Sequence, residues 1–468
     1  MRVVLCTATA FHLEHPPLGL TYLKSSLIQN GHSVKCLDLS IGDNNLVSCP
    51  VPPDRNIEEY LDQNYETISS WVDRIETYQP DIVGITLWAS SKNSASALAL
   101  LLKRRLTTAL IIGGGPDVLS YTIKDYLNYF DYLIEKEGEL TLCQFLDEYQ
   151  KNGKTTQTKG VWYKNAQQVC LSAPAERIKD LDSLAFPDFS DFVIESYSGE
   201  IPVEFSRGCN ANCTFCNGKH YFDRQKSRSG LSMYQEIVHH SRHFNCYKFI
   251  FVGDNLLSAT TFKEFMTFCD QVIKDKLKIE WRIYNQRVDS LIDETCVKKM
   301  VAAGLKKVTF GVESFSERVR QDMGKVASDA VTDRALSAFI DQGVKVALLM
   351  IYGYPIETEA DFQQTLTWLR GKSERLAHIC FNCFVVNSEY CSNRPGIVKF
   401  EDDSYHLYKW RSDAVDRGGR QQRFLRLIET LNALNVEYMV SDPHLNRYYR
   451  NWNKQLKAEL EKEWTTQS

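Results

Sequence analysis

The most informative stretch of this chain reads Cys209-Asn210-Ala211-Asn212-Cys213-Thr214-Phe215-Cys216. Three cysteines stand within eight residues in the spacing C-x3-C-x2-C. Three thiolates can hold three irons of a [4Fe–4S] cube, which leaves the fourth iron without a protein ligand. An open iron beside a low-potential cluster is a place where a small molecule can bind and be reduced. The spacing therefore predicts a cluster held by Cys209, Cys213 and Cys216.

A zinc site is the alternative interpretation of the same cysteines. Structural zinc usually takes four ligands and favours C-x2-C pairs, and His220 is the candidate for the fourth ligand. Further along, Cys380, Cys383 and Cys391 suggest a second cluster. The first two fall in an apolar run typical of a strand and no fourth ligand accompanies them, so we expect ordinary buried cysteines there.

Length and composition indicate a protein of two or three domains, because 468 residues are ample for separate hydrophobic cores. The formal net charge of −4 gives no field that favours nucleic acid or an anionic membrane surface. No apolar run approaches the ~18 residues of a membrane-spanning helix, and the N-terminus predicts a strand instead of a signal peptide. With 14 cysteines and no signal peptide, we expect a cytoplasmic protein whose thiols stay reduced.

Residues 1–150 alternate short apolar runs with helical patterns. This alternation predicts βαβ units and a doubly wound parallel sheet, as in Rossmann-like and flavodoxin-like domains. Ligands of such sheets bind at the carboxyl ends of the strands. Two glycine-containing loops are predicted at that edge, Pro16-Pro17-Leu18-Gly19-Leu20 and Gly113-Gly114-Gly115-Pro116. Glycines let the backbone approach a large ligand closely.

The rest of the chain divides into three predicted parts. Residues 151–198 are a linker with one hairpin, since two short apolar runs flank a polar turn. Residues 199–390 contain six predicted strands with intervening helices, which predicts a partial (β/α)6 barrel with the cysteine loop after its first strand. Residues 391–468 have a polar, mostly helical pattern. The predicted fold class is therefore α/β, with a doubly wound domain, a partial (β/α)6 barrel and a mostly helical C-terminal region.

Four further motifs follow the cysteines in order. They are Gly253-Asp254-Asn255 after an apolar strand, Arg287 at the end of the next strand, Gly311-Val312-Glu313-Ser314, and Gly353-Tyr354-Pro355-Ile356-Glu357-Thr358. Together with the cysteine loop, these motifs resemble those of the radical S-adenosylmethionine (radical SAM) enzymes. The resemblance implies that SAM chelates the open iron. It also implies that SAM contacts the following residues: Phe215, Gly253, Asp254, Arg287, Glu313, Ser314, Lys325 and Gly353.

The N-terminal part resembles the cobalamin-binding domain that precedes the radical SAM core in one large subgroup of that family. The match runs through PPLGLTYLKSSLIQNGHSV, PDIVGITLWAS, IIGGGPDV and FDYLIEKEGELTL. The resemblance places bound cobalamin against Leu18, Gly19, Thr86, Gly114, Gly115 and Pro116. No D-x-H-x-x-G motif is present, so no histidine of that motif ligates cobalt. The chain departs from the subgroup at Asp117-Val118-Leu119, where a His-Ala-Thr-like stretch is common, and at the bulky Trp88.

Two functions are open at this point. The subgroup implies C-methylation of a small-molecule substrate in specialised metabolism, in which a 5′-deoxyadenosyl radical removes hydrogen from an unactivated C–H bond. The departures at Trp88 and Asp117 motivate the alternative, a cobalamin-free radical dehydratase, epimerase or cyclase that acts on a sugar-like or other natural-product intermediate and retains a degenerate N-terminal domain. Both need one electron from a donor such as flavodoxin or ferredoxin. The sequence singles out no catalytic acid or base.

The sequence supports two further classes of protein function less well. A non-enzymatic iron–sulfur or zinc protein would not need so many motifs in order. An RNA-modifying methylthiotransferase would want a basic appended domain, and the arginines and aromatic residues near the C-terminus are only a faint sign of one.

Overall fold

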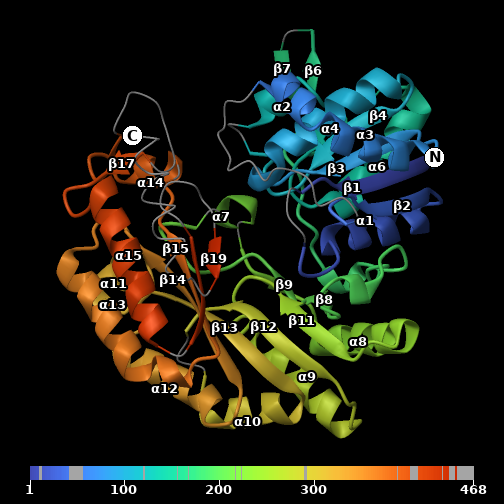
Figure 1. Cartoon of the computed structure of the whole chain (residues 1–468). Coiled ribbons are helices and arrows are strands. Elements are labelled where there is room, and N and C mark those ends of the chain that lie inside the picture. Colours follow the sequence, from blue (N-terminus) through green and yellow to red (C-terminus); the bar gives the residue numbers. More distant parts are fainter. Residues whose placement is uncertain are drawn as a thin grey trace. The chain divides into compact units, whose positions relative to one another are not determined.

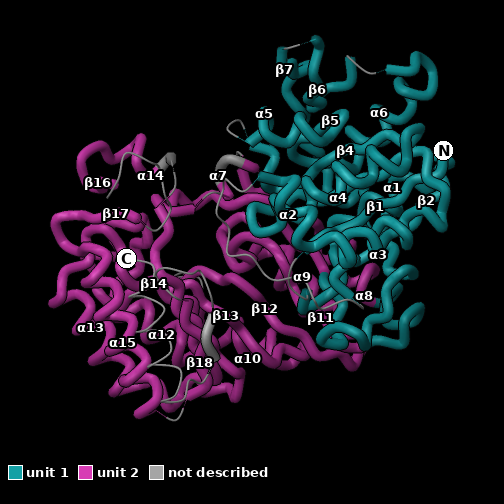
Figure 2. The backbone as a smooth tube through the Cα atoms, turned by 45° about the horizontal axis from the view of Figure 1, so that its top comes forward, with its two compact units in different colours: residues 1–202, 238–246 teal, residues 203–237, 247–468 magenta. Residues whose placement is uncertain are grey.

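The computed structural model describes residues 1–9, 13–41, 56–119, 122–154, 157–166, 168–216, 218–222, 224–288, 292–386, 388–400, 409–434, 436–441 and 448–450. The chain divides into two compact units (Figure 2), residues 1–202 with 238–246 and residues 203–237 with 247–468. Each unit is built around its own large sheet. Within the described ranges, no helix combines the length and hydropathy that a membrane crossing requires.

The first unit contains a seven-stranded sheet of order β2-β1-β3-β4-β5-β6-β7 (Figure 1). Its strands are β1 (Arg2–Thr7), β2 (Ser33–Asp38), β3 (Ile82–Thr86), β4 (Leu110–Gly114), β5 (Tyr132–Ile134), β6 (Val161–Asn165) and β7 (Gln168–Leu171). The first five strands are parallel, whereas β6 and β7 form an antiparallel hairpin at the sheet edge. The order 2-1-3-4-5 is flavodoxin-like. The predicted doubly wound sheet is confirmed, and the predicted hairpin extends it.

Helices cover both faces of this sheet. They are α1 (Leu18–Gln29), α2 (Ile57–Gln63), α3 (Tyr65–Glu76), α4 (Lys92–Arg105), α5 (Ile123–Tyr126) and α6 (Gly138–Asn152), with single turns η1 (Ala89–Ser91), η2 (Leu181–Ser183) and η3 (Ile194–Ser196). Alternate residues of β1 serve two cores. Val4 and Cys6 pack with residues of α2, α3 and α4, whereas Val3 and Leu5 pack with residues of α1 and α6. Burial on both faces explains why these strands are continuous apolar runs in the sequence.

The second unit contains an eight-stranded sheet of order β8-β11-β12-β13-β14-β15-β18-β19. Its strands are β8 (Ile201–Glu204), β11 (Lys248–Val252), β12 (Glu280–Gln286), β13 (Leu305–Glu313), β14 (Lys345–Tyr352), β15 (His378–Cys383), β18 (Glu437–Ser441) and β19 (Tyr448–Arg450). Strands β11 to β18 run parallel and β19 runs antiparallel. The six strands predicted within residues 199–390 are thus present as neighbours in chain order.

The remaining elements connect or flank these strands. The helices are α7 (Gly218–Tyr221), α8 (Gly230–Phe244), α9 (Phe262–Lys274), α10 (Glu294–Ala302), α11 (Glu317–Asp322), α12 (Asp329–Ile340), α13 (Glu359–Lys372), α14 (Ser388–Asn393), α15 (Arg417–Ala433) and the turn η4 (Ser373–Arg375). Two short ribbons pair β9 (Ser206–Arg207) with β10 (Lys226–Ser227) and β16 (Lys399–Phe400) with β17 (Trp410–Arg411). Figure 1 shows α9, α10, α12 and α13 in succession along the sheet of the second unit.

The region after residue 390 contributes strands as well as the predicted helices. Strand β18 lies beside β15 and continues the main sheet by one parallel strand. The Tyr352 hydroxyl donates to the Ser441 carbonyl (2.6 Å), and the Cys383 N–H donates to Ser441 Oγ (2.7 Å). The C-terminal region therefore completes the second unit.

Candidate functional site

The cysteine loop follows β8 and carries three thiols of different exposure. Cys213 is buried, Cys209 is half-buried and Cys216 is exposed. Each sulfur accepts an N–H: Cys209 from Ala211 (3.3 Å), Cys216 from Gly218 (3.3 Å) and Cys213 from Arg287 Nη1 (2.5 Å). Burial raises the pKa of Cys209, while the Ala211 N–H and the Arg287 charge oppose that rise. A donor set of thiolates alone suits iron–sulfur clusters, so these residues fit the predicted [4Fe–4S] cube.

The cysteine loop packs on the turn that follows α11. Gly324 has φ +75°, and a Cβ at this position would lie only 2.6 Å from the Asn212 carbonyl oxygen. The Thr214 N–H donates to the Met323 carbonyl (3.1 Å). Only glycine allows this approach of two backbones at this φ. This turn thus fixes the position of the cysteine loop on both sides of Cys213.

Arg287 contacts the cysteine loop as well as the turn. Its Nη1 donates to Cys213 Sγ, and its Nη2 donates to the Gly324 carbonyl at 3.4 Å. The resemblance implied a contact between this residue and SAM. The structure places the guanidinium directly against the buried Cys213, where it supplies positive charge beside the sulfur.

Glu313 and Lys325 form a buried ion pair in the same region. Glu313 Oε1 lies 2.9 Å from Lys325 Nζ, and the two side chains are 11% and 9% exposed. Lys325 Nζ also donates to the Gly311 carbonyl (2.5 Å) and lies 5.8 Å from the centroid of the Phe215 ring. Glu313 has φ +71°, and the β13–β14 register shifts between Gly311 and Glu313. Such strained positions cost about 1–3 kcal/mol and gather at functional sites.

A cavity of about 340 Å³ lies beside this ion pair. It is lined by Arg287, Val288, Gly311, Val312, Arg320, Lys325, Val326, Ala327, Ser328, Val331 and Thr332. Cationic side chains among apolar ones suit a ligand that combines a carboxylate with less polar groups. SAM has this character, so the residues present fit it.

Gly253 and Asp254 lie at the end of β11, near the start of the cysteine loop. The Gly208 N–H donates to the Asp254 carboxylate. Asp254 remains accessible to solvent, yet the surrounding loops desolvate its carboxylate enough to raise the pKa. Two buried amides hold this turn: Gln225 Nε2 donates to the Asp254 carbonyl (2.8 Å) and Gln286 Nε2 to Asn255 Oδ1 (2.9 Å). The sequence pattern singles out neither glutamine, because each acts through partners about 30 residues away in the chain.

Two residues expected to contact SAM make other contacts. Ser314 is fully buried and its Oγ accepts the Ser316 N–H (3.1 Å). Gly353 donates its N–H to Glu357 Oε2 (2.8 Å), and a Cβ there would lie 2.8 Å from carbons of Arg420. The structure therefore gathers Phe215, Arg287, Glu313 and Lys325 around the cysteine loop, with Gly253 and Asp254 near its start.

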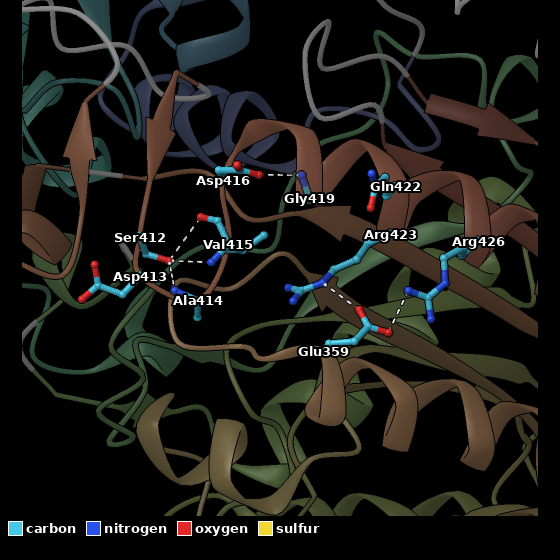
Figure 3. A pocket seen from close by; sticks show the side chains of 10 residues that line it. All are labelled: Glu359, Ser412, Asp413, Ala414, Val415, Asp416, Gly419, Gln422, Arg423 and Arg426. Atoms are coloured by element: carbon cyan, nitrogen blue, oxygen red, sulfur yellow. Dashed lines mark hydrogen bonds and ion pairs between the residues drawn. The ribbon is translucent and has the colours of Figure 1, made fainter.

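A second cavity, of about 270 Å³, lies at the beginning of α15 (Figure 3). Its lining includes Glu359, which points between Arg423 and Arg426; Glu359 Oε1 is 2.7 Å from Arg426 Nη1. Arg423 Nη1 lies 2.8 Å from Oε2 of the buried Glu357. Glu359 is therefore neutralised by the two arginines, and Arg423 also supports the loop that contains Gly353 through Glu357.

In the first unit, the residues expected to contact cobalamin gather at the carboxyl ends of β1, β3 and β4. Thr86 of β3 pairs with Thr7 of β1 on one side and with Gly114 of β4 on the other. The Thr7 hydroxyl is buried and has no hydrogen-bond partner among the described residues. Gly115 has φ +126°, and a Cβ there would lie 2.8 Å from the Leu87 carbonyl oxygen.

The first turn of α1 contributes the other expected contacts. Leu18 is half-buried, Gly19 is exposed, and no atom lies within 4 Å of a Cβ built on Gly19. Pro116 is likewise exposed beyond β4. The glycines at this edge leave space beside the backbone, and the buried Thr7 hydroxyl has no hydrogen-bond partner among the described residues. Both features fit a large ligand at the switch point between β1 and β3. The residues present therefore fit cobalamin.

The structure describes both residues at which the chain departs from the subgroup, Asp117 and Trp88. Asp117 is buried and accepts a hydrogen bond from the Tyr126 hydroxyl, and burial raises its pKa although that hydrogen bond opposes the rise. Trp88 is 45% exposed. Neither disturbs the sheet, since Leu87 and Gly114 still bond through their backbones (2.7 Å).

The other cysteine expectations can also be placed. Cys380 and Cys383 lie buried in β15, and Cys391 is half-buried on α14. In the part of the chain that the structure describes, no three His, Cys, Asp or Glu side chains form a site for a single metal ion. The side chain of His220, the candidate fourth zinc ligand, lies outside the described atoms.

Comparison with protein families matches two domains. Residues 4–146 match the B12 binding domain, and residues 203–369 match the radical SAM superfamily. The chain is 25% identical over 363 residues to an uncharacterised methyltransferase of Pyrococcus horikoshii, which covers 76% of this chain and 73% of that protein. It is 23% identical over 365 residues to the anaerobic magnesium-protoporphyrin IX monomethyl ester cyclase of Synechocystis, over 76% of this chain and 68% of the cyclase.

Two solved structures share the fold over nearly the whole chain. The radical SAM methyltransferase TsrM from Kitasatospora setae, solved with cobalamin and a [4Fe–4S] cluster, has a TM-score of 0.65 at 15% identity over 90% of this chain and 85% of TsrM. The cobalamin-dependent radical SAM enzyme OxsB, solved with aqua-cobalamin and SAM, has a TM-score of 0.64 at 17% identity over 99% of this chain and 66% of OxsB. At such identities the likeness shows the fold.

The matched domains agree with the features of the two units. The radical SAM match includes the cysteine loop and the Glu313–Lys325 pair, and the B12 match includes the glycine-lined edge of the first sheet. The predicted cofactors, a [4Fe–4S] cluster, SAM and cobalamin, are those that these two domains use. The chain therefore carries a B12 binding domain followed by a domain of the radical SAM superfamily.

Proposed function

We propose that this protein is a cobalamin-dependent radical SAM methyltransferase that methylates a carbon atom of a small molecule in specialised metabolism. The observation that supports it most is the joint presence of two fitting sites in one chain. Three cysteines stand beside a cationic cavity in the second unit, and a glycine-lined strand edge is present in the first. Methyltransferases among the similar proteins add weight to this choice.

Each site residue has a role in the proposal. Cys209, Cys213 and Cys216 hold the cluster, and the cationic side chain of Arg287 attracts the SAM carboxylate. Lys325 neutralises Glu313, whose carboxylate accepts hydrogen bonds from SAM hydroxyl or amino groups. When bound, the cluster and SAM supply a 5′-deoxyadenosyl radical, and cobalamin supplies the methyl group. The protein holds the target C–H bond in place and excludes water.

An external donor provides the electron. Of the three proposed ligands, Cys216 is the one exposed to solvent. We propose that a flavodoxin or ferredoxin reduces the cluster from this side.

A second candidate function keeps the radical and omits methyl transfer. The similarity to the Synechocystis cyclase favours it, because that protein is named for a ring closure. The product would then be a dehydrated, epimerised or cyclised molecule that gains no carbon.

Methyl-labelled SAM separates the two functions. The protein is produced with cobalamin available, reconstituted anaerobically with iron and sulfide, and incubated with reductant, small-molecule extract and SAM that carries a CD3 group. We expect retained corrinoid and a product that has gained CD3. A product without label, formed together with 5′-deoxyadenosine, would establish the second candidate.

The cluster assignment is tested by Cys213→Ala. Loss of one of three thiolates should abolish iron–sulfur absorbance and SAM cleavage, whereas Cys269→Ala, which changes a buried cysteine of α9, should leave both in place. Wild-type cleavage by Cys213→Ala would refute the assignment.

A further inference from the structure

We propose that Asp322 and Tyr354 are positioning residues that tie the cluster-binding loop to the loop after β14, and that they thereby set the affinity for SAM. This inference rests on the proposed function, because it takes the cysteine loop as the cluster site. No motif in the sequence marks Asp322, and the sequence assigns no role to Tyr354, which stands between a glycine and a proline.

Asp322 is the centre of the network. Its Oδ2 accepts hydrogen bonds from the Tyr354 hydroxyl (2.9 Å) and from Arg394 Nη1 (2.5 Å). Its backbone carbonyl accepts from Thr214 Oγ1 (3.2 Å) and from Arg394 Nη2 (3.0 Å). One residue at the end of α11 therefore joins the cysteine loop, the loop after β14 and the segment that follows α14.

Thr214 is the point at which this network reaches the cluster site. It lies directly after Cys213 and two residues before Cys216. Its N–H donates to the Met323 carbonyl (3.1 Å), and its Oγ1 lies 2.9 Å from the Tyr354 hydroxyl. A shift of Thr214 would move both neighbouring sulfur atoms. Displacements of about 1 Å in a site can cost 10²-fold in rate.

Tyr354 is held so that its hydroxyl has little freedom. The side chain is fully buried, and its ring makes edge contacts with Phe384 (4.9 Å between centroids) and Tyr390 (5.8 Å). The residue before it, Gly353, is fixed by Glu357, which in turn pairs with Arg423. The Tyr354 hydroxyl is thus a polar contact through which the loop after β14 positions the cysteine loop.

The turn after Asp322 completes the argument for an effect on SAM. Residues 322–325 also contain Gly324, which packs on the loop at Cys213, and Lys325, which pairs with Glu313 beside the cavity. If Asp322 loses its partners, the cysteine loop and Lys325 move relative to each other. Because SAM would bind both the cluster and this cavity, its binding depends on their relative placement.

The test is a double-mutant cycle with Tyr354→Phe and Thr214→Val, which remove the two hydroxyls while keeping side-chain shape. Each reconstituted protein is examined for iron content, for SAM affinity by equilibrium dialysis, and for the change that SAM causes in the EPR spectrum of the reduced cluster. We expect near-normal iron content, about tenfold weaker SAM binding in each single variant, and an altered EPR response. The loss of binding free energy in the double variant should be smaller than the sum of the two single losses, because the two hydroxyls belong to one network.

Tyr438→Phe is the matched control. Tyr438 is also buried in the second unit, and its hydroxyl donates to Asn432 Oδ1 (2.5 Å) outside the network. It should show wild-type SAM affinity even if its thermal stability falls. Wild-type affinity and EPR response in both Tyr354→Phe and Thr214→Val, or strictly additive losses in the double variant, would overturn the inference.

The outcomes also separate this inference from the proposed function. Failure of the wild-type protein to assemble a cluster or bind SAM defeats the proposed function. Normal cluster assembly with unaffected variants defeats only the positioning role. If Tyr354→Phe does not fold, Thr214→Val alone decides, because Thr214 is half-buried at the edge of the core.

Discussion

At the scale of single residues, the second unit concentrates unusual backbone at its carboxyl edge. Asn255, Asn285 and Glu313 all have positive φ, and they lie at or near the ends of β11, β12 and β13. These three strands are neighbours in the sheet. Positive φ is uncommon for such residues, especially for glutamate. The strain therefore marks one edge of the sheet, where Asp254, Arg287 and Lys325 also lie.

Gly115→Ala tests the cobalamin edge at the same scale. The new Cβ would lie 2.8 Å from the Leu87 carbonyl oxygen at φ +126°, so the loop after β4 must move. We expect the free energy of unfolding to fall by about 1–3 kcal/mol and retained corrinoid to drop severalfold. Urea unfolding and the visible spectrum of the purified protein measure the two effects.

Gly153→Ala is the control for backbone strain alone. Gly153 has φ +67° at the end of α6, but nothing lies within 4 Å of a Cβ built there. The free energy of unfolding of this variant should fall by about 1–2 kcal/mol, and the variant should retain its corrinoid. Equal corrinoid retention in both variants would remove the loop after β4 from the proposed site.

At the scale of elements, one carboxylate joins two helices of the second unit. Asp361 forms a capping box with Thr358 at the start of α13 and accepts a hydrogen bond from Ser316 Oγ (2.6 Å) at the start of α11. Arg318 donates to the same carboxylate. Burial works against the charge, yet these hydrogen bonds outweigh it and hold the pKa of Asp361 below its usual value.

Asp361→Asn should destabilise the protein by about 1–3 kcal/mol at neutral pH, the cost of a lost cap and a lost charged hydrogen bond. Because the folded pKa is depressed, the stabilisation is present above the unfolded pKa near 3.8 and disappears as pH falls through the lower folded pKa. Urea unfolding of the cluster-free protein is measured between pH 7 and 3. The difference in the free energy of unfolding between wild type and Asp361→Asn should become smaller below about pH 4.

An exposed carboxylate provides the comparison. Asp341 is 61% exposed and pairs with an exposed Arg375, so Asp341→Asn should change the free energy of unfolding by less than about 1 kcal/mol at any pH. A constant difference between wild type and Asp361→Asn down to pH 3 would contradict the ionised role of Asp361.

At the scale of the whole molecule, each unit has its own sheet and core, and the second unit needs the end of the described chain. Helix α15 buries Phe424, Leu427 and Leu431 completely, and β18 extends the sheet. The burial of these three side chains contributes about 5–9 kcal/mol. That amount is comparable with the total stability of an ordinary domain, about 5–15 kcal/mol.

A chain that ends at Asp416 should therefore fail to form the second unit, although it keeps all six barrel strands predicted from the sequence. We expect loss of iron–sulfur reconstitution and loss of cooperative thermal unfolding for that unit, whereas the first unit should still bind corrinoid. Full cluster assembly in the shortened protein would show that α15 and β18 are dispensable.

The amino-acid sequence by itself determined the alternation of strands and helices along the chain, the two α/β regions, the cysteine loop and the glycine-lined edge. These features depend on near neighbours in the chain: the apolar runs of buried strands, the spacing of Cys209, Cys213 and Cys216, and glycines beside strand ends. Only the tertiary structure decided which partner each polar side chain takes. Arg287 donates to Cys213, Gly353 to Glu357, and Asp322 joins Thr214 to Tyr354. The physical reason is distance along the chain, because Thr214 and Tyr354 are 140 residues apart and only the folded sheet brings their hydroxyls within 2.9 Å.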